Sequence, residues 1–219
     1  MNEKKNLTTK ETFALAVQNQ KKNNFQAAEN LYKEVLKINP NHFESIFYLG
    51  SLSLQTKNFD LAKSLLEKAI KIRPNFARAH NNLGIVFGEL GQSEKAKSHF
   101  KKAIKIQPDF ANAYYNLGVV LNELGEDQKA IGYYEKVIQI QPNYVNAHNN
   151  LGVILSELGE HQKAISCYEK AIHIEPNNLT SHWLSMNTFP IVYENLKEID
   201  HYRKRFENSI KKINQLLDT

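Results

Sequence analysis

Three asparagines stand at the same place in consecutive segments of this sequence, and their side chains suit peptide recognition. Asn82, Asn116 and Asn150 are spaced 34 residues apart, and each directly precedes a leucine and a glycine. A carboxamide both donates and accepts hydrogen bonds. The backbone of an extended peptide offers the complementary groups at every residue. One asparagine per segment therefore predicts a ladder along a groove, able to hold a peptide with little demand on its side chains.

Further residues extend the predicted peptide-binding groove beside this ladder. They are Asn81, Tyr115, Asn149, Asn112 and Asn146. A row of glutamates recurs at the same step: Glu89, Glu123 and Glu157. This row would favour basic peptide segments. An alternative stays open for each row. The asparagines can be solvated residues that are simply common in this repeat, and the glutamates can form a solvated edge with no role in binding.

Metal and nucleophile chemistry is not expected from the remaining candidate residues. His80, His148 and His182 share one place in the repeated segments. Neighbouring helices pack about 8–10 Å apart, whereas zinc needs nitrogens at about 2.0 Å. We therefore expect these histidines to pack between helices, with no metal and no cofactor. Cys167 has no candidate base in register and is interpreted as a plain thiol.

The same 34-residue period predicts the helices that position these residues. Prolines fall at 40, 74, 108, 142 and 176, a fixed step of 34 that is typical of a stacked helical array. Residues 111–124 carry apolar side chains at helical spacing: Tyr114, Leu117, Val120 or Leu121, and Leu124. Gly125 should end this helix. Residues 127–140 carry a second apolar face, and Pro142 should stop it because proline disfavours helix at the preceding residue.

Each segment is therefore predicted to be two helices joined by a short turn, and the 34-residue pattern resembles the tetratricopeptide repeat. The resemblance rests on Leu-Gly in the first helix, an alanine and an aromatic residue in the second, and the closing proline. It implies an all-α, right-handed superhelical solenoid with a C-terminal capping helix. We expect an N-terminal extension, 1–8, and five repeats: 9–42, 43–76, 77–110, 111–144 and 145–178. Thr8 and Glu11 predict a capping box at the start of the first helix.

The tail, 179–219, is predicted to contain a degenerate half-repeat, a linker and a C-terminal helix. Terminal repeats need a cap over their last apolar face, and the tail can be that cap. Residues 189–213 also resemble the linker that follows the repeats in bacterial proteins of the SPINDLY type, which are similar to O-linked N-acetylglucosamine transferases. That resemblance rests on a short set of positions: Pro190, Ile191, Tyr193, Glu198, Ile199, Arg203, Arg205 and Phe206. It implies that an asparagine ladder here binds the backbone of substrate peptides.

The composition of the chain limits the classes of partner that we expect. The net charge of +5, from 28 basic and 23 acidic residues, is mild and does not call for nucleic acid. No stretch approaches the roughly 20 apolar residues of a membrane span. The start has no apolar core and is not a secretory signal, and one cysteine fits a reducing, cytoplasmic compartment.

The function predicted from the sequence is protein–protein recognition, with an extended peptide in the concave groove. The main hypothesis is the substrate-recruiting region of a SPINDLY-like protein O-glycosyltransferase that has no catalytic domain in this chain. The rival hypothesis is a free-standing adaptor or scaffold, and a third is that the repeats precede another enzyme. Neither the bound partner nor the oligomeric state follows from the residues.

Overall fold

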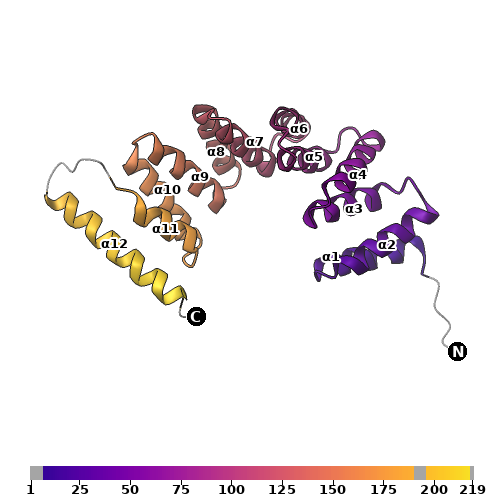
Figure 1. Cartoon of the computed structure of the whole chain (residues 1–219), viewed down its shortest axis with the longest axis horizontal. Helices are drawn as coiled ribbons and strands as arrows, with labels where there is room; N and C mark the ends of the chain where they lie inside the picture. Colours follow the sequence, from indigo (N-terminus) through magenta and orange to yellow (C-terminus); the bar gives the residue numbers. More distant parts are fainter. Residues whose placement is uncertain (1–6, 190–195, 218–219) are drawn as a thin grey trace. The chain divides into compact units, whose positions relative to one another are not determined.

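The computed structural model describes residues 7–189 and 196–217, and this part of the chain is all helix and turn (Figure 1). Its twelve helices are α1 (Thr9–Lys21), α2 (Phe25–Ile38), α3 (Phe43–Gln55), α4 (Phe59–Ile72), α5 (Ala77–Glu89), α6 (Ser93–Ile106), α7 (Ala111–Glu123), α8 (Asp127–Ile140), α9 (Val145–Glu157), α10 (His161–Ile174), α11 (Leu179–Asn187) and α12 (Leu196–Leu217). No helix among the described residues combines the length and the apolar character that a membrane crossing requires.

The chain divides into two compact halves, Met1–Ala113 and Tyr114–Thr219. In the N-terminal half each helix packs on the next, from α1 to α6, and first helices also contact one another, as α3 does with α5. In the C-terminal half α8 to α12 pack in the same sequential way. Consecutive helix-turn-helix pairs are the architecture that the sequence period predicts, so the all-α repeat fold is confirmed.

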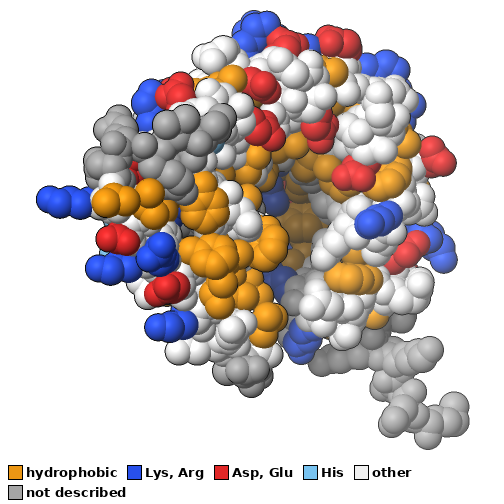
Figure 2. Space-filling model, turned by 60° about the vertical axis from the view of Figure 1, so that its left-hand side comes forward, with side chains coloured by type: hydrophobic (Ala, Val, Ile, Leu, Met, Phe, Trp, Pro, Cys, Tyr) orange, Lys and Arg blue, Asp and Glu red, His pale blue; other side chains and the backbone are white. Residues whose placement is uncertain are grey.

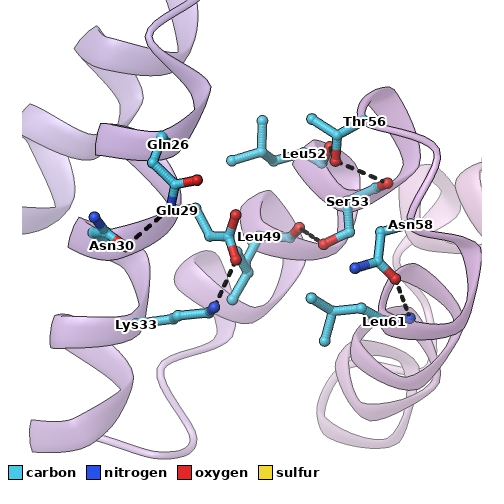
Figure 3. A network of polar contacts seen from close by, with 10 residues as sticks. All are labelled: Gln26, Glu29, Asn30, Lys33, Leu49, Leu52, Ser53, Thr56, Asn58 and Leu61. Carbon is cyan, nitrogen blue, oxygen red and sulfur yellow. Dashed lines mark hydrogen bonds and ion pairs between the residues drawn. The ribbon is translucent and has the colours of Figure 1, made fainter.

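Polar side chains cap the starts of α1, α3, α4 and α11. Thr8 and Glu11 form the predicted capping box: the Glu11 carboxylate accepts the Thr8 N–H at 2.8 Å, and Thr8 Oγ1 accepts the Glu11 N–H at 3.2 Å. Because these hydrogen bonds favour the charged carboxylate, the pKa of Glu11 is lowered. Asn58 caps α4 by accepting the Leu61 N–H at 3.2 Å (Figure 3).

Polar pairs along exposed helix faces add to these caps. On α2, Lys33 lies 2.6 Å from Glu29, one turn away (Figure 3). Exposed pairs at this spacing stabilise a helix by roughly 0.3–0.5 kcal/mol. On α3, Ser53 Oγ donates to the Leu49 carbonyl at 2.8 Å, so the buried hydroxyl is satisfied within its own helix. The caps and pairs hold individual helices, while packing between helices holds the repeats.

The turn between the two helices of a repeat needs one residue in the left-handed region. Gly91, Gly125 and Gly159 occupy this place with φ of 69°, 72° and 79°. The same place one and two repeats earlier holds Lys57 and Asn23, with φ of 58° and 60°. Glycine enters this region without steric cost, so the later repeats form the same turn without the strain that Lys57 carries.

The repeat interior is built from the apolar faces that the spacing predicts, with one exception. Leu117, Val120 and Leu121 of α7 are buried, as are Ala130 and Tyr134 of α8. Leu124 continues the predicted apolar row but is 44% exposed. It follows the last helical residue of α7, Glu123, and begins the turn, where the side chain no longer lies over the core face.

Glycine in each first helix lets an aromatic ring of the second helix approach. A Cβ added at Gly152 would lie 2.5 Å from Tyr168, and one at Gly84 would lie 2.6 Å from Phe100. Real Cβ atoms are essentially never this close to another heavy atom. The Leu-Gly pair of the repeat is therefore a packing requirement, because the glycine makes room for the buried ring.

The C-terminal helix α12 packs on α11, as Figure 1 shows. Phe189 lies with its ring centroid 6.1 Å from that of Tyr202 and 6.1 Å from that of Phe206. The buried Tyr202 also donates to Gln162 Oε1 of α10 at 3.4 Å. Tyr202 stands 34 residues after Tyr168, so α12 places an aromatic residue where the second helix of a repeat does. The linker residues Pro190, Ile191 and Tyr193 lie outside the described residues.

Candidate peptide-binding face

Asn82 lies partly exposed on α5, with its amide held by the preceding repeat. Its Nδ2 donates to Ser51 Oγ of α3 at 2.9 Å. The Ser51 hydroxyl in turn donates to the Phe47 carbonyl at 2.9 Å. Asn81 Nδ2 lies 3.4 Å from Asn82 Oδ1. The carboxamide of Asn82 is therefore fixed in direction by a bond between two first helices.

Asn150 on α9 is held in a similar way, but by tyrosines. Its Nδ2 is shared between Tyr115 Oη at 3.2 Å and Tyr134 Oη at 3.3 Å. Burial raises the pKa of Tyr115, and it raises that of Tyr134 to about 12, so both phenols are neutral at physiological pH. The Tyr115 ring also packs 5.1 Å from that of Tyr144. With Nδ2 engaged, Asn150 offers its Oδ1 as the group for an incoming donor.

The other predicted groove residues divide into exposed and buried groups. Asn116 and Tyr115 are partly exposed on α7, and Asn112 and Asn146 are exposed near the starts of α7 and α9. Asn81 and Asn149 are instead buried. Asn149 Nδ2 donates to Ser181 Oγ of α11 at 2.9 Å, so this amide joins two first helices inside the stack. The glutamates Glu89, Glu123 and Glu157 are exposed at the ends of their first helices.

The histidines of the repeat make a recurring bond that sequence reasoning did not find. His80, His148 and His182 each have Nε2 at 2.9–3.0 Å from the carbonyl of a proline six residues earlier, Pro74, Pro142 or Pro176. Each imidazole thereby satisfies the closing turn of the preceding repeat. The common step from proline to histidine is the signal in the sequence that could have revealed this bond.

In the N-terminal half, His80 also meets His99 of α6. Their Nδ1 atoms are 3.2 Å apart. Since His80 Nε2–H donates to the Pro74 carbonyl, its Nδ1 is an acceptor and His99 Nδ1–H is the donor. Among the described residues no group of three or more histidine, cysteine or acidic side chains is arranged to hold a metal ion. Cys167 is buried, and burial raises the pKa of its thiol.

Two residues that support the ladder were missed from the sequence. Ser51 and Tyr134 hold the amides of Asn82 and Asn150, yet Ser51 belongs to no row of polar residues at the 34-residue step, and Tyr134 belongs to the aromatic row that the spacing assigns to packing. Where the ladder place holds Tyr48 instead of asparagine, its ring packs 5.7 Å from Phe13 and 6.2 Å from Tyr32. The ladder place thus holds a fixed amide at Asn82 and Asn150 and a packed aromatic ring at Tyr48.

Paired helices closed by proline, with polar residues on the first-helix faces, define a helical-repeat protein, and comparison with known proteins gives its family. The family description "Tetratricopeptide repeat" matches residues 20–83 and 109–174, and "TPR repeat" matches 88–125. A crystal structure of MamA is 30% identical, with 74% of this chain and 94% of that chain covered and a TM-score of 0.66. The chain belongs to the tetratricopeptide repeat family.

Two further solved structures share the fold at lower identity. PilF of Pseudomonas aeruginosa is 19% identical over 95% of this chain and 91% of its own, with a TM-score of 0.80. YrrB, described as a TPR protein with an unusual peptide-binding site, is 21% identical over 80% of this chain and 90% of its own, with a TM-score of 0.61. The search of curated proteins gave no match. Tetratricopeptide repeat proteins bind protein or peptide partners, and the chain is an interaction module of this kind.

Proposed function

We propose that the chain is a scaffold that binds an extended peptide along its first helices, contacted by Asn82 in the N-terminal half and by Asn116 and Asn150 in the C-terminal half. The observation that carries the proposal is the fixed direction of two ladder amides. Ser51 holds Asn82, and Tyr115 with Tyr134 holds Asn150. An oriented amide loses little side-chain entropy on binding, and pre-organisation of this kind increases affinity.

The engaged Nδ2 atoms refine the chemistry of the proposed contact. The Nδ2 atoms of Asn82 and Asn150 already donate to partners within the chain, and each Oδ1 atom has a lone pair for a peptide donor, that of Asn82 in addition to the bond it accepts from Asn81. These Oδ1 atoms would accept backbone N–H groups of the bound segment. The exposed glutamate row then adds a preference for basic residues beside the contacted backbone. A reducing, cytoplasmic compartment belongs to the proposal, supported by the single cysteine.

The experiment compares two triple variants on an array of unrelated 15-residue peptides. Asn82→Ala, Asn116→Ala and Asn150→Ala together should abolish most spots that the unaltered chain binds. The matched control replaces three exposed turn asparagines, Asn75, Asn143 and Asn177, by alanine. It should leave the pattern unchanged. Equal binding by both variants would count against the ladder.

The covered lengths of the relatives favour an adaptor or scaffold over a glycosyltransferase arm. This chain matches 94% of the MamA chain and 91% of the PilF chain through the repeat fold alone. The glycosyltransferase-recruiting role remains the second proposal, supported by the ladder and by the linker-like residues of α12. Mass spectrometry of the C-terminal peptide of the native polypeptide separates the two. A catalytic domain following Thr219 would favour the transferase.

A further inference from the structure

The stacking of first helices buries the same two places in the second, third and fifth repeats. Phe43 and Phe47 of α3 are 5% and 2% exposed. Val145 and Asn149 of α9, three repeats later, are 7% and 4% exposed. Residues at these places contact the next repeat: Phe47 lies 4.9 Å from Phe76 in ring centroids, and Asn149 donates to Ser181.

The element that covers these places is the first helix of the following repeat. Helix α5 packs against α3, and α11 packs against α9. The covering helix presents a small residue at its third position. Ser181 of α11 meets Asn149, and Ala113 of α7 packs with Ala77 of α5. The contacts between consecutive repeats therefore show which kind of helix fits the face formed by these two places.

At the C-terminal end the same two places are open. Leu179 and Trp183 of α11 stand 34 residues after Val145 and Asn149, yet they are 40% and 57% exposed. Phe206 of α12 is also exposed. Trp183 replaces a buried asparagine, so the place carries its largest apolar side chain where it is least covered. Figure 2 brings the C-terminal end of the chain forward and shows hydrophobic side chains gathered there, with charged side chains beside them.

The charged residues around this face indicate which kind of partner can bind there. Helix α11 has no charged residue, whereas α12 has six basic residues, Lys197, Arg203, Lys204, Arg205, Lys211 and Lys212, and three acidic ones, Glu198, Asp200 and Glu207. A second copy meeting face to face would bring together two surfaces of like excess charge, which opposes association. In head-to-tail stacking, this face of one copy would meet the start of α1 of another copy. Thr8, Glu11 and Thr12 at that start are polar and joined in the capping contacts, so they do not complement an apolar face.

We propose that Leu179, Trp183 and Phe206, here called the end face, dock an acidic amphipathic helix of a partner protein. This helix takes the place of a following first helix. It sets a small residue, alanine or serine, against Trp183, as Ser181 stands against Asn149. Its acidic flanks meet the basic residues of α12. The end face is separate from the asparagine ladder, so one chain can hold an extended peptide and a helical partner at once.

Trp183 is the only tryptophan of the chain, so its fluorescence reports directly on the end face. The probe is a synthetic 18-residue helix with alanine and leucine on one face and glutamate on the other. A second peptide has lysine at the glutamate positions. The glutamate peptide should shift the Trp183 emission to shorter wavelength. It should bind at least about tenfold more tightly than the lysine peptide at low salt, and this preference should fade as salt screens the charges.

Variants then locate the binding. Leu179→Glu keeps the Trp183 reporter and should weaken the glutamate peptide about tenfold or more, through lost apolar contact and like charge. The control Ile38→Ala alters an apolar residue on α2 that is 68% exposed, and this variant should bind normally. Trp183→Ala, followed by calorimetry, should also lose binding, and its unchanged circular dichroism would show that the chain still folds.

Three results would overturn the proposal. The first is no emission shift with either peptide at millimolar concentration. The second is equal binding of the glutamate and lysine peptides, which would contradict the proposal that the partner helix is acidic. The third is a concentration-dependent shift of the chain alone together with dimers in sedimentation, which would make a second copy the occupant. The asparagine triple variant should bind the helix normally, so failure of the ladder and failure of the end face are distinguishable.

Discussion

At the scale of single residues, close contacts decide which side chains the repeat accepts. Gly84, Gly118 and Gly152 stand under the rings of Phe100, Tyr134 and Tyr168, and each ring is buried. A buried ring cannot move aside without disturbing its own neighbours, since protein interiors are close-packed. The repeated glycine is thus explained by packing, while two of the repeated asparagines, Asn82 and Asn150, are partly exposed with their amides held.

Replacing Gly152 by alanine should destabilise the chain even though alanine is the better helix former. The added Cβ would meet Tyr168 at 2.5 Å. Overpacking of this kind costs about 1–3 kcal/mol. Gly132→Ala in α8 is the matched control, because nothing lies within 4 Å of its added Cβ. That change should stabilise by up to about 1 kcal/mol. Urea unfolding of both variants checks the difference, and equal effects of the two changes would contradict it.

At the scale of elements, each first helix is tied to its neighbours by a few polar bonds in an apolar setting. The histidine of α5 satisfies the turn before it and meets His99 of α6. Because burial disfavours the charged imidazole, the pKa of His80 is lowered, and that of His99 is lowered to about 4 by burial, His80 and Lys102. The junction of α5 and α6 is therefore stable with both rings neutral.

This junction predicts a loss of stability in acid. A lowered folded pKa means that the stabilising contribution is present above the ordinary histidine value of 6.5 and is lost as the pH falls toward about 4. His99→Tyr, which places the residue found at Tyr133, removes one titrating group. Its melting temperature should fall less between pH 7 and pH 4.5 than that of the unaltered chain. The exposed His173→Gln should follow the unaltered chain, and identical slopes for all three would contradict the assignment.

At the scale of the whole molecule, repeated helix pairs follow one another along the sequence, and the first and last pairs differ. The start of α1 is closed by a capping box, while the last helix pair covers α10 through Tyr202 and leaves Trp183 exposed. Terminal repeats of such arrays need a covering element to keep their apolar faces from water. Helix α12 supplies part of this cover.

Removing residues 190–219 should therefore destabilise the C-terminal half. Loss of α12 would open the surroundings of Phe189 and part of α10 to water, at a cost of several kcal/mol from the apolar area exposed. Tyr202→Ala within the intact chain should reproduce most of the effect, since removing a large buried aromatic side chain costs about 3–5 kcal/mol. Thermal unfolding followed by circular dichroism measures both, and an unchanged melting temperature would show that α12 is not a cap.

The repeat fold could largely be predicted from the sequence, because the 34-residue period marks positions that pack in the same way in every repeat. The bounds of α7 and α8 and the capping box of Thr8 follow from local signals. The exposure of Leu124 could not be predicted, because spacing alone does not show where a helix gives way to its turn. The bonds of Asn82 to Ser51 and of Asn150 to Tyr134 depend on how neighbouring repeats stack, which no local pattern encodes.

The most direct test of the ladder separates backbone recognition from side-chain recognition. An array-selected peptide is compared by calorimetry with a version of scrambled side-chain order and with a version N-methylated at alternate amides. If the Oδ1 atoms of Asn82, Asn116 and Asn150 accept peptide N–H groups, scrambling should change Kd little. N-methylation should weaken binding about tenfold or more, the loss expected from one or more hydrogen bonds. Full affinity of the N-methylated peptide, with loss on scrambling, would contradict the account.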